Sequence, residues 1–263
     1  MDFHRNRSAQ PLRAALSWLQ ILVKSLLAAG FGLLLAAGWL RHDLPTPDRL
    51  LDSLQQEPEQ VEVREQAFNT TVSGVTYTVQ PLYRYELHGL VVSMHDTSTW
   101  WNYIHREWND KLNVVDFCVI WGRNAASGAY RKMSYSSGQF VCYFQVPDQE
   151  SFQAFDMAGL SNNHVLTDDP FVAKRLRSVR IGDQIRFSGY LAEYSHNHNG
   201  QPFKRGTSTV RTDTGNGACE TIYVKDFEII RHGGGPWRSM FWVAWALIGA
   251  GIVGWFRLPL SQH

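Results

Sequence analysis

The stretch RIGDQIRFSGYLAEY, residues 180–194, decides how the last part of the central region folds. Gly182 and Asp183 are residue types that favour a tight turn. The residues that follow are typical of a strand, which Gly189 interrupts. A further strand is predicted at 220–230, ETIYVKDFEII, directly before a Gly-rich linker. This part of the chain is therefore predicted to be a sheet that ends close to the C-terminal apolar segment.

Residues 180–194 resemble a strand pair of OB-type barrels, in which a turn ending in Gly-Asp starts a strand bent at a glycine. The strand 220–230, followed by a linker, is similar to the last strand of such barrels. The resemblance covers only these two segments, and no named family is matched over the whole chain. It implies a curved antiparallel sheet or an OB-like barrel. Because helices are also predicted between the strands, we expect an α+β fold rather than a plain five-stranded barrel.

Outward from this stretch, enrichment in β-branched and aromatic residues predicts strands at 75–96, 114–122 and 139–146. The Gly- and Ser-rich segment between the last two predicts that they form a hairpin. Helices are predicted after a cap at Thr97 or Ser98 and after Pro170. The intervening LSNNHVLTDDP, 160–170, is predicted to be a polar loop.

The two ends of the chain are strongly apolar. Residues 19–40 carry one charged side chain, Lys24, and residues 240–256 carry none. A helix of about 20 apolar residues spans a bilayer, so both segments are predicted to be transmembrane helices. A cleaved signal peptide is the alternative for the first, but its apolar run exceeds the usual h-region of about 7–15 residues. A buried core helix is the alternative for the second.

Basic residues concentrate on the N-terminal side of the first span, which predicts a cytoplasmic N-terminus. Two spans return the C-terminus to the cytoplasm and place the main domain in the periplasm or outside the cell, with the spans in a bacterial inner membrane. The expected segments are a cytoplasmic N-terminus (1–18), a first span (19–40), a stalk (41–74), an extracytoplasmic α+β domain (75–232), a linker (233–238), a second span (239–257) and a cytoplasmic tail (258–263).

Composition narrows the classes of function. The net charge is +1, from 25 basic and 24 acidic side chains, so no global bias toward nucleic acid exists. Because both ends are tethered and no strong catalytic motif is present, we expect a binding or assembly module of the cell envelope. Its expected partners are the lipid bilayer and a protein or envelope polymer, and no cofactor or metal is expected.

The three cysteines separate into a pair and a remainder. Cys118 and Cys142 fall opposite each other if strands 114–122 and 139–146 pair about a loop near residue 130. In an oxidising compartment such a pair forms a disulfide, and two buried free thiols are the alternative. Cys219 is left over. As a nucleophile it would need a histidine, and His164 is the candidate for a membrane-anchored hydrolase.

Asp213 begins the segment DTGNG, 213–217, and is the third candidate catalytic residue. An aspartic-protease loop and a phosphate-binding loop are possible interpretations, but the flanking residues fit neither pattern. A tight turn that leads into the last strand fits the Gly and Asn residues better. Candidate binding residues are Trp100 and Trp101, which offer a stacking surface, and Asn162 and Asn163 beside His164. The pair His196 and His198 provides a third, weaker hypothesis of a zinc site.

Overall fold

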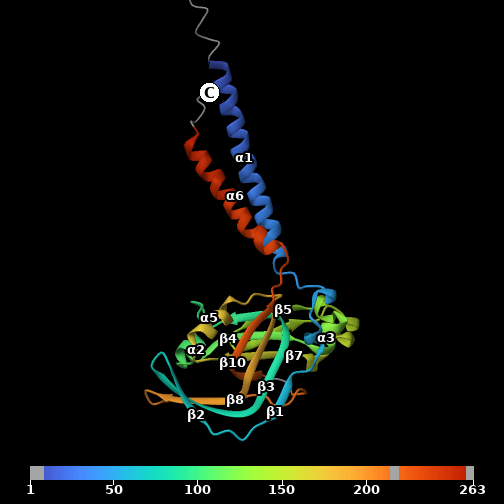
Figure 1. Ribbon diagram of the computed structural model, residues 1–263, viewed down its shortest axis with the longest axis vertical. Coiled ribbons are helices and arrows are strands. Elements are labelled where there is room, and N and C mark those ends of the chain that lie inside the picture. The colour runs from blue at the N-terminus through green and yellow to red at the C-terminus, as the bar shows by residue number, and fades with distance from the viewer. Residues whose placement is uncertain (1–8, 214–218, 259–263) are drawn as a thin grey trace, which may run out of the picture. The chain divides into compact units, whose positions relative to one another are not determined.

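The computed structural model describes residues 9–213 and 219–258, and the chain divides into two compact units. One unit contains helices from both ends of the chain, up to Asp43 and from Gly234 onward. The other unit runs from Leu44 to Gly233 and contains every strand of the described residues (Figure 1).

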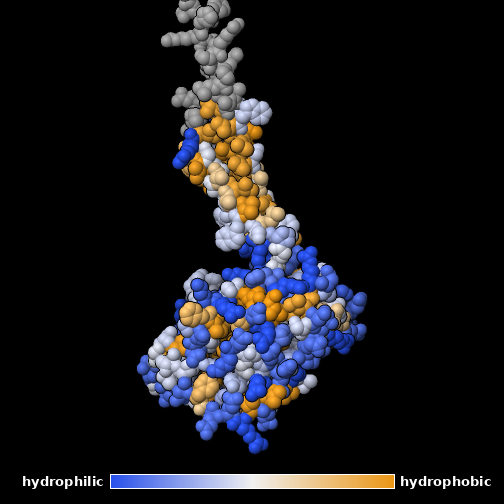
Figure 2. Space-filling model, in the orientation of Figure 1, coloured by the Kyte–Doolittle hydropathy of each residue, from blue (hydrophilic) through white to orange (hydrophobic). Residues whose placement is uncertain are grey.

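The two terminal helices are α1, Ala9–Leu40, and α6, Trp237–Arg257, and they pack against each other. The stretches Leu16–Leu40 and Trp237–Arg257 are each long and apolar enough to cross a membrane. Apolar residues dominate their visible surface (Figure 2). At Gly30 a Cβ would lie 2.8 Å from Ile248 Cγ1, so glycine permits the close approach of the two helices.

Five strands of the larger unit pair in a cycle. They are β3 (Val75–Asp96), β4 (Asn113–Ile120), β7 (Leu160–Leu166), β8 (Gln184–His198) and β10 (Cys219–Arg231). Strand β3 pairs with β4, β4 with β7, β7 with β10, β10 with β8, and β8 again with β3. The β7–β10 pair is parallel, whereas the other four are antiparallel. The expected curved antiparallel sheet is therefore found except at this one pair, which is parallel.

Gly189 has the role that the sequence stretch indicated. It pairs with Val224 of β10 on one side and with Tyr85 of β3 on the other. A Cβ at this position would lie 2.1 Å from the Tyr223 carbonyl oxygen. The absence of a side chain therefore allows β8 to approach β10 closely, next to the register shift between Val224 and Asp226.

Helix α5, Pro170–Ser178, follows β7 and packs on the same core as the five paired strands. Asp169 caps it, because its carboxylate accepts hydrogen bonds from the backbone N–H groups of Phe171 and Val172 at 2.7 and 3.3 Å. Leu176 is completely buried against the sheet. The helix predicted after Pro170 is thus present, with the predicted start.

The remaining elements are short. They are η1 (Pro47–Arg49), η2 (Asp52–Gln55), β1 (Glu59–Glu62), β2 (Phe68–Val72), α2 (Ile104–Glu107), α3 (Gly122–Ser127), η3 (Ala129–Lys132), β5 (Ser134–Gly138), β6 (Val141–Gln145), α4 (Gln149–Ala154), η4 (Met157–Gly159) and β9 (Gln201–Arg205). The helix expected after residue 97 is reduced to the single turn α2, and the rest of that segment is irregular.

The segment 41–74, expected to be a stalk, belongs to the folded unit from Leu44 onward. Strands β1 and β2 both pair with β3. Leu50 and Leu54 are buried in a cluster that also contains Leu90. The difference has a simple cause: acidic and proline residues make the segment look solvated, but its leucines and strand residues pack on the sheet.

The hairpin expected between strands 114–122 and 139–146 is not present, because these two strands do not pair with each other. Strand β4 lies between β3 and β7, whereas β6 pairs with β5 in a separate two-stranded sheet. The residues between them form α3 and η3 rather than one long loop. Cys118 and Cys142 nevertheless form the predicted disulfide, with their Cα atoms 5.7 Å apart. The bond links the small β5–β6 sheet to β4.

The bonding state of the three cysteines can be measured directly. After alkylation without reduction, we expect peptides containing Cys118 and Cys142 to remain joined and Cys219 to be the one modified cysteine. Peptide mapping by mass spectrometry of the full chain measures this. Alkylated Cys118 and Cys142 in protein purified from an oxidising compartment would contradict the expectation.

Candidate functional site

Strand β7 carries the polar residues of the candidate site. The sequence predicted a loop here, but β7 lies in the sheet between β4 and β10, and Asn162, Asn163 and His164 are buried. Neighbouring side chains along a strand point to opposite faces, so Asn162 and His164 share one face and Asn163 faces the other. The Asn163 amide donates hydrogen bonds to the Phe117 carbonyl and the Ser161 hydroxyl. The side-chain donors of Asn162, Asn163 and His164 are therefore all paired with acceptors of the protein.

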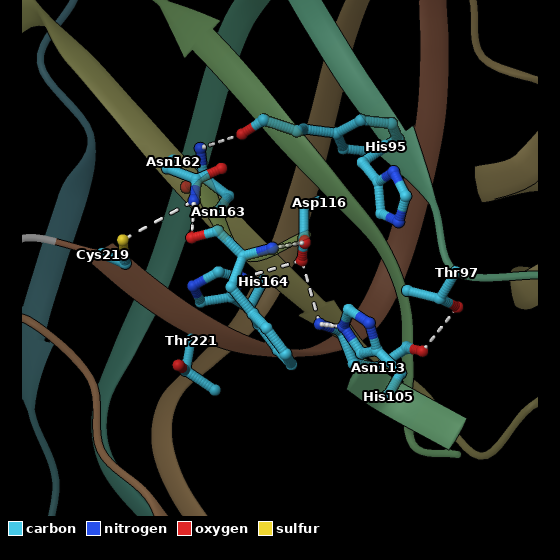
Figure 3. A network of polar contacts seen from close by, with 12 residues as sticks. His95, Thr97, His105, Asn113, Asp116, Asn162, Asn163, His164, Cys219 and Thr221 are labelled. Carbon is cyan, nitrogen blue, oxygen red and sulfur yellow. Dashed lines mark hydrogen bonds and ion pairs between the residues drawn. The ribbon is translucent and has the colours of Figure 1, made fainter. Parts of the chain in front are cut away.

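Asp116, the one charged residue in the apolar strand β4, is the centre of a buried network (Figure 3). Its Oδ1 accepts hydrogen bonds from His164 Nδ1 at 2.7 Å and from Asn113 Nδ2 at 2.9 Å. Its Oδ2 accepts the Phe140 N–H at 3.0 Å. Burial opposes the charge on this carboxyl, but His164 and these hydrogen bonds hold its pKa below the ordinary value.

A second part of the network extends from Asn113 toward the loop after β3. Asn113 Nδ2 lies 3.1 Å from His105 Nε2, and His105 Nδ1 lies 2.6 Å from Asn102 Oδ1. The Asn102 oxygen can only accept and the Asn113 amide nitrogen can only donate, so His105 is neutral with its proton on Nδ1. Burial is the main cause that lowers the pKa of His105, to about 4.

Both ring nitrogens of His164 are occupied. Nδ1 donates to Asp116, and Nε2 accepts a hydrogen bond from Arg205 Nη2 at 2.7 Å. Burial lowers the pKa of His164, and Arg205 lowers it further against the opposing effect of Asp116. His164 is therefore a neutral link between a buried carboxylate and a guanidinium that reaches the surface.

Phe140 covers this link from the tip of the β5–β6 hairpin. Its ring lies 3.8 Å from the His105 ring, centroid to centroid, and Cζ of the Arg205 guanidinium lies 4.0 Å from the centroid of the Phe140 ring. Its backbone has φ +64°, a conformation that non-glycine residues rarely adopt. The Asp116 carboxylate and the stacking contacts hold the residue in this conformation.

A cavity of about 990 Å³ opens beside the network. It lies between the β5–β6 hairpin, the start of β7 and the connection from β9 to β10. The apolar part of its wall includes Trp108, Phe140, Phe144 and Val210, and its polar part includes Asn162, Lys204, Arg205, Arg211, Asp213, Cys219 and Glu220.

Arg211 and Glu220 form an ion pair in the wall of the cavity, with Nη1 and Oε1 2.9 Å apart. Arg211 also donates to the Tyr85 hydroxyl at 3.2 Å, which fixes its guanidinium. Burial raises the pKa of Glu220 to about 7, although Arg211 acts in the opposite direction.

The structure brings several of the predicted site residues together. Cys219, Asp213 and Asn162 line the cavity, and His164 lies behind it through its contact with Arg205. The Cys219 sulfur is 3.6 Å from Asn162 Nδ2, and burial raises the pKa of its thiol. Asp213 accepts a hydrogen bond from the Ser208 hydroxyl at 2.6 Å. The rest of the turn expected at 213–217 lies outside the described residues.

Trp100 and Trp101 are not part of the cavity. They are 79% and 54% exposed and contact each other edge to face, with centroids 5.5 Å apart. Asn163 also has no direct access to the cavity, because its side chain is buried on the other face of β7. The zinc hypothesis involves His196, whose Nε2 instead lies 2.9 Å from the Trp108 carbonyl. Among residues 9–213 and 219–258, no cluster of three or more potential metal ligands occurs.

Sequence reasoning missed Asp116, Arg205 and Phe140. A signal existed for Asp116, since VVDFCVIWG places one carboxylate in an otherwise apolar strand, and a buried carboxylate needs partners. No comparable signal marks Arg205 or Phe140, because their importance depends on contacts with residues far away in the sequence.

No protein-family model, curated protein or solved structure matches this chain.

Proposed function

We propose that this chain is a two-pass protein of the bacterial inner membrane whose periplasmic domain is a binding or assembly module. The two apolar helices support membrane insertion, and the Cys118–Cys142 disulfide supports an oxidising compartment. The excess of basic residues before the first span supports cytoplasmic termini. The partner is a protein or a polymer of the cell envelope.

The domain is proposed to be an OB-type barrel. The cyclic pairing of β3, β4, β7, β10 and β8 supports this, as does the bend of β8 at Gly189. Barrels of this type bind extended ligands across one sheet face and adjoining loops. In this chain the β5–β6 hairpin and the buried network cover part of β4 and β7. The accessible cavity therefore lies beside the β9–β10 connection and not on the open sheet face that such barrels use.

The observation that carries the proposal is a large cavity next to a polar network in which His164 has no free ring nitrogen. A cavity of about 990 Å³ is within the size range of binding sites. A general base must be free to accept a proton, whereas both ring nitrogens of His164 are engaged by Asp116 and Arg205.

A hydrolase that uses Cys219 and His164 is the alternative function. The raised thiol pKa of Cys219 disfavours the thiolate that such a nucleophile requires. The lack of a free His164 nitrogen disfavours activation by a base. Binding is therefore the better supported of the two functions.

Photo-crosslinking in living cells tests the proposal. A photoreactive phenylalanine analogue at Val210, which is 55% exposed and lines the cavity, is expected to give a discrete higher-mass adduct. The matched control carries the analogue at Phe171, which is 80% exposed on α5 and does not line the cavity, and is expected to give none. The adduct is expected to persist in Cys219→Ser. No adduct at Val210, or loss of it in Cys219→Ser, would contradict a purely binding role.

A further inference from the structure

Arg205 differs from the other cations in the wall of the cavity. Lys204 pairs with Glu193 at 2.8 Å and Arg211 pairs with Glu220 at 2.9 Å. No carboxylate of the described part of the chain lies within 4.0 Å of the Arg205 guanidinium. Its one hydrogen bond to a described residue uses Nη2, which leaves the donors on Nη1 and Nε for another acceptor.

The guanidinium is also held in place before any ligand arrives. His164 fixes Nη2 from behind, and Asp116 fixes His164 through Nδ1. Phe140 supports the guanidinium, with Cζ 4.0 Å from the ring centroid. A rigid guanidinium with free donors is suited to the planar, two-point recognition of carboxylate and phosphate groups. Because its geometry is preset, little conformational entropy is lost on binding.

The surroundings favour a negatively charged ligand. Of the two acidic side chains in the wall, Glu220 is neutralised by Arg211 and Asp213 accepts a hydrogen bond from Ser208. Three cations of the described wall, Lys204, Arg205 and Arg211, stand against these two carboxylates, an excess of one positive charge. Trp108 and Phe144 also line the cavity and provide apolar surface for a ring or a hydrocarbon part of the same ligand.

We infer that Arg205 is the anchor of an anion-binding subsite in this cavity and that it takes a carboxylate or phosphate group attached to a ring-bearing partner. This inference rests on the proposed binding function and names the chemical class of the ligand. His164 and Asp116 are positioning residues, since they act on the ligand only through Arg205.

Ligand-observed saturation-transfer NMR on the full chain in detergent tests the inference with three probes. Glucuronate carries a carboxylate, glucose 1-phosphate carries a phosphate, and glucose is the uncharged control. We expect at least one anion to bind the wild type and glucose to bind more weakly. Arg205→Gln is expected to weaken the anion about tenfold or more, because a charge-assisted hydrogen bond is lost. The stronger of the two anions identifies the natural group as carboxylate or phosphate.

Two further variants test whether the loss of affinity is specific to the guanidinium of Arg205. Lys132→Gln removes an exposed charge that pairs with Glu150 at 3.4 Å and does not line the cavity, and it is expected to change the affinity less than twofold. Arg205→Lys keeps the charge but loses the planar, two-point donor geometry of the guanidinium, and is expected to give an intermediate affinity. The inference is overturned if neither anion binds the wild type, if glucose binds equally well, or if Lys132→Gln weakens binding as much as Arg205→Gln. A Val210 adduct that is unchanged in Arg205→Gln would also overturn it, while leaving the proposed binding function intact.

Discussion

Asp116→Ala is expected to destabilise the unit Leu44–Gly233 by about 3–5 kcal/mol, since it breaks a buried charged network. The substitution removes the acceptor of three donors: His164 Nδ1, Asn113 Nδ2 and the Phe140 N–H. His164 Nδ1 and the Phe140 N–H are then buried without a partner, and Asn113 Nδ2 keeps only its contact with His105 Nε2. Each unsatisfied group costs about 1–3 kcal/mol. A whole domain is commonly stable by only about 5–15 kcal/mol, so the variant is expected to be partly unfolded at 37 °C.

Urea unfolding of the full chain in detergent, followed by pulse proteolysis, measures this free energy. Asp226→Ala is the matched control, because it also removes a carboxylate of the sheet. Asp226 is 60% exposed and pairs with Arg186 at 2.7 Å, and such surface pairs contribute less than about 1 kcal/mol. If Asp116→Ala and Asp226→Ala lost the same small amount, the buried network would not stabilise the fold.

The features that the sequence could predict are those set by local chemistry. The apolar runs at both ends, the Asp169-Pro170 helix start and the glycine in the bent strand β8 depend on residues close in the chain, and the structure contains each of them. The disulfide was predicted correctly from an incorrect hairpin. The two cysteines are brought together by the packing of the β5–β6 sheet on β4 and not by pairing of their strands.

The features that could not be predicted depend on distant partners. In isolation, SNNH has the composition of a loop, because asparagine and histidine need hydrogen bonds that water normally supplies. In β7 those bonds come from Asp116 on β4, the Phe140 carbonyl and Arg205 at the end of β9. These partners are 22 to 48 residues away from β7 in the sequence. The same long-range contacts form the candidate site. The site could therefore not be predicted, for the same reason that β7 was predicted to be a loop.

Acidification from pH 7 to about 4.5 is expected to cost the Glu220→Gln variant about 3 kcal/mol more stability than the wild type. Glu220 has a folded pKa of about 7, above its ordinary value of 4.5. The folded wild type therefore binds more protons than the unfolded chain in this interval, and its stability rises as the pH falls through it. Glutamine cannot take up this proton, so the variant lacks the gain of about 1.4 kcal/mol per pKa unit.

Protonation of His105 changes the stability in the opposite direction, so the loss of the Glu220 contribution appears as a net decline in stability at low pH. Its folded pKa of about 4 lies below the ordinary 6.5, so stability is lost as the pH falls from 6.5 toward 4. In the wild type Glu220 offsets this loss, together with Asp110, whose pKa burial raises to about 6. In Glu220→Gln part of the offset is gone, and the stability profile is expected to decline steeply on the acid side.

Urea unfolding at pH 7, 5.5 and 4.5 gives the two profiles, and NMR of the His105 ring gives the opposing titration directly. Glu150→Gln is the matched control, because the Glu150 side chain is 86% exposed and pairs with Lys132 at 3.4 Å. Its profile is expected to run parallel to that of the wild type. Parallel profiles for Glu220→Gln and the wild type would mean that Glu220 is already ionised at low pH. A His105 ring that titrates near 6.5 would mean that its hydrogen bonds with Asn102 and Asn113 do not hold it neutral. Either result would remove the electrostatic basis for a rigid wall around the cavity.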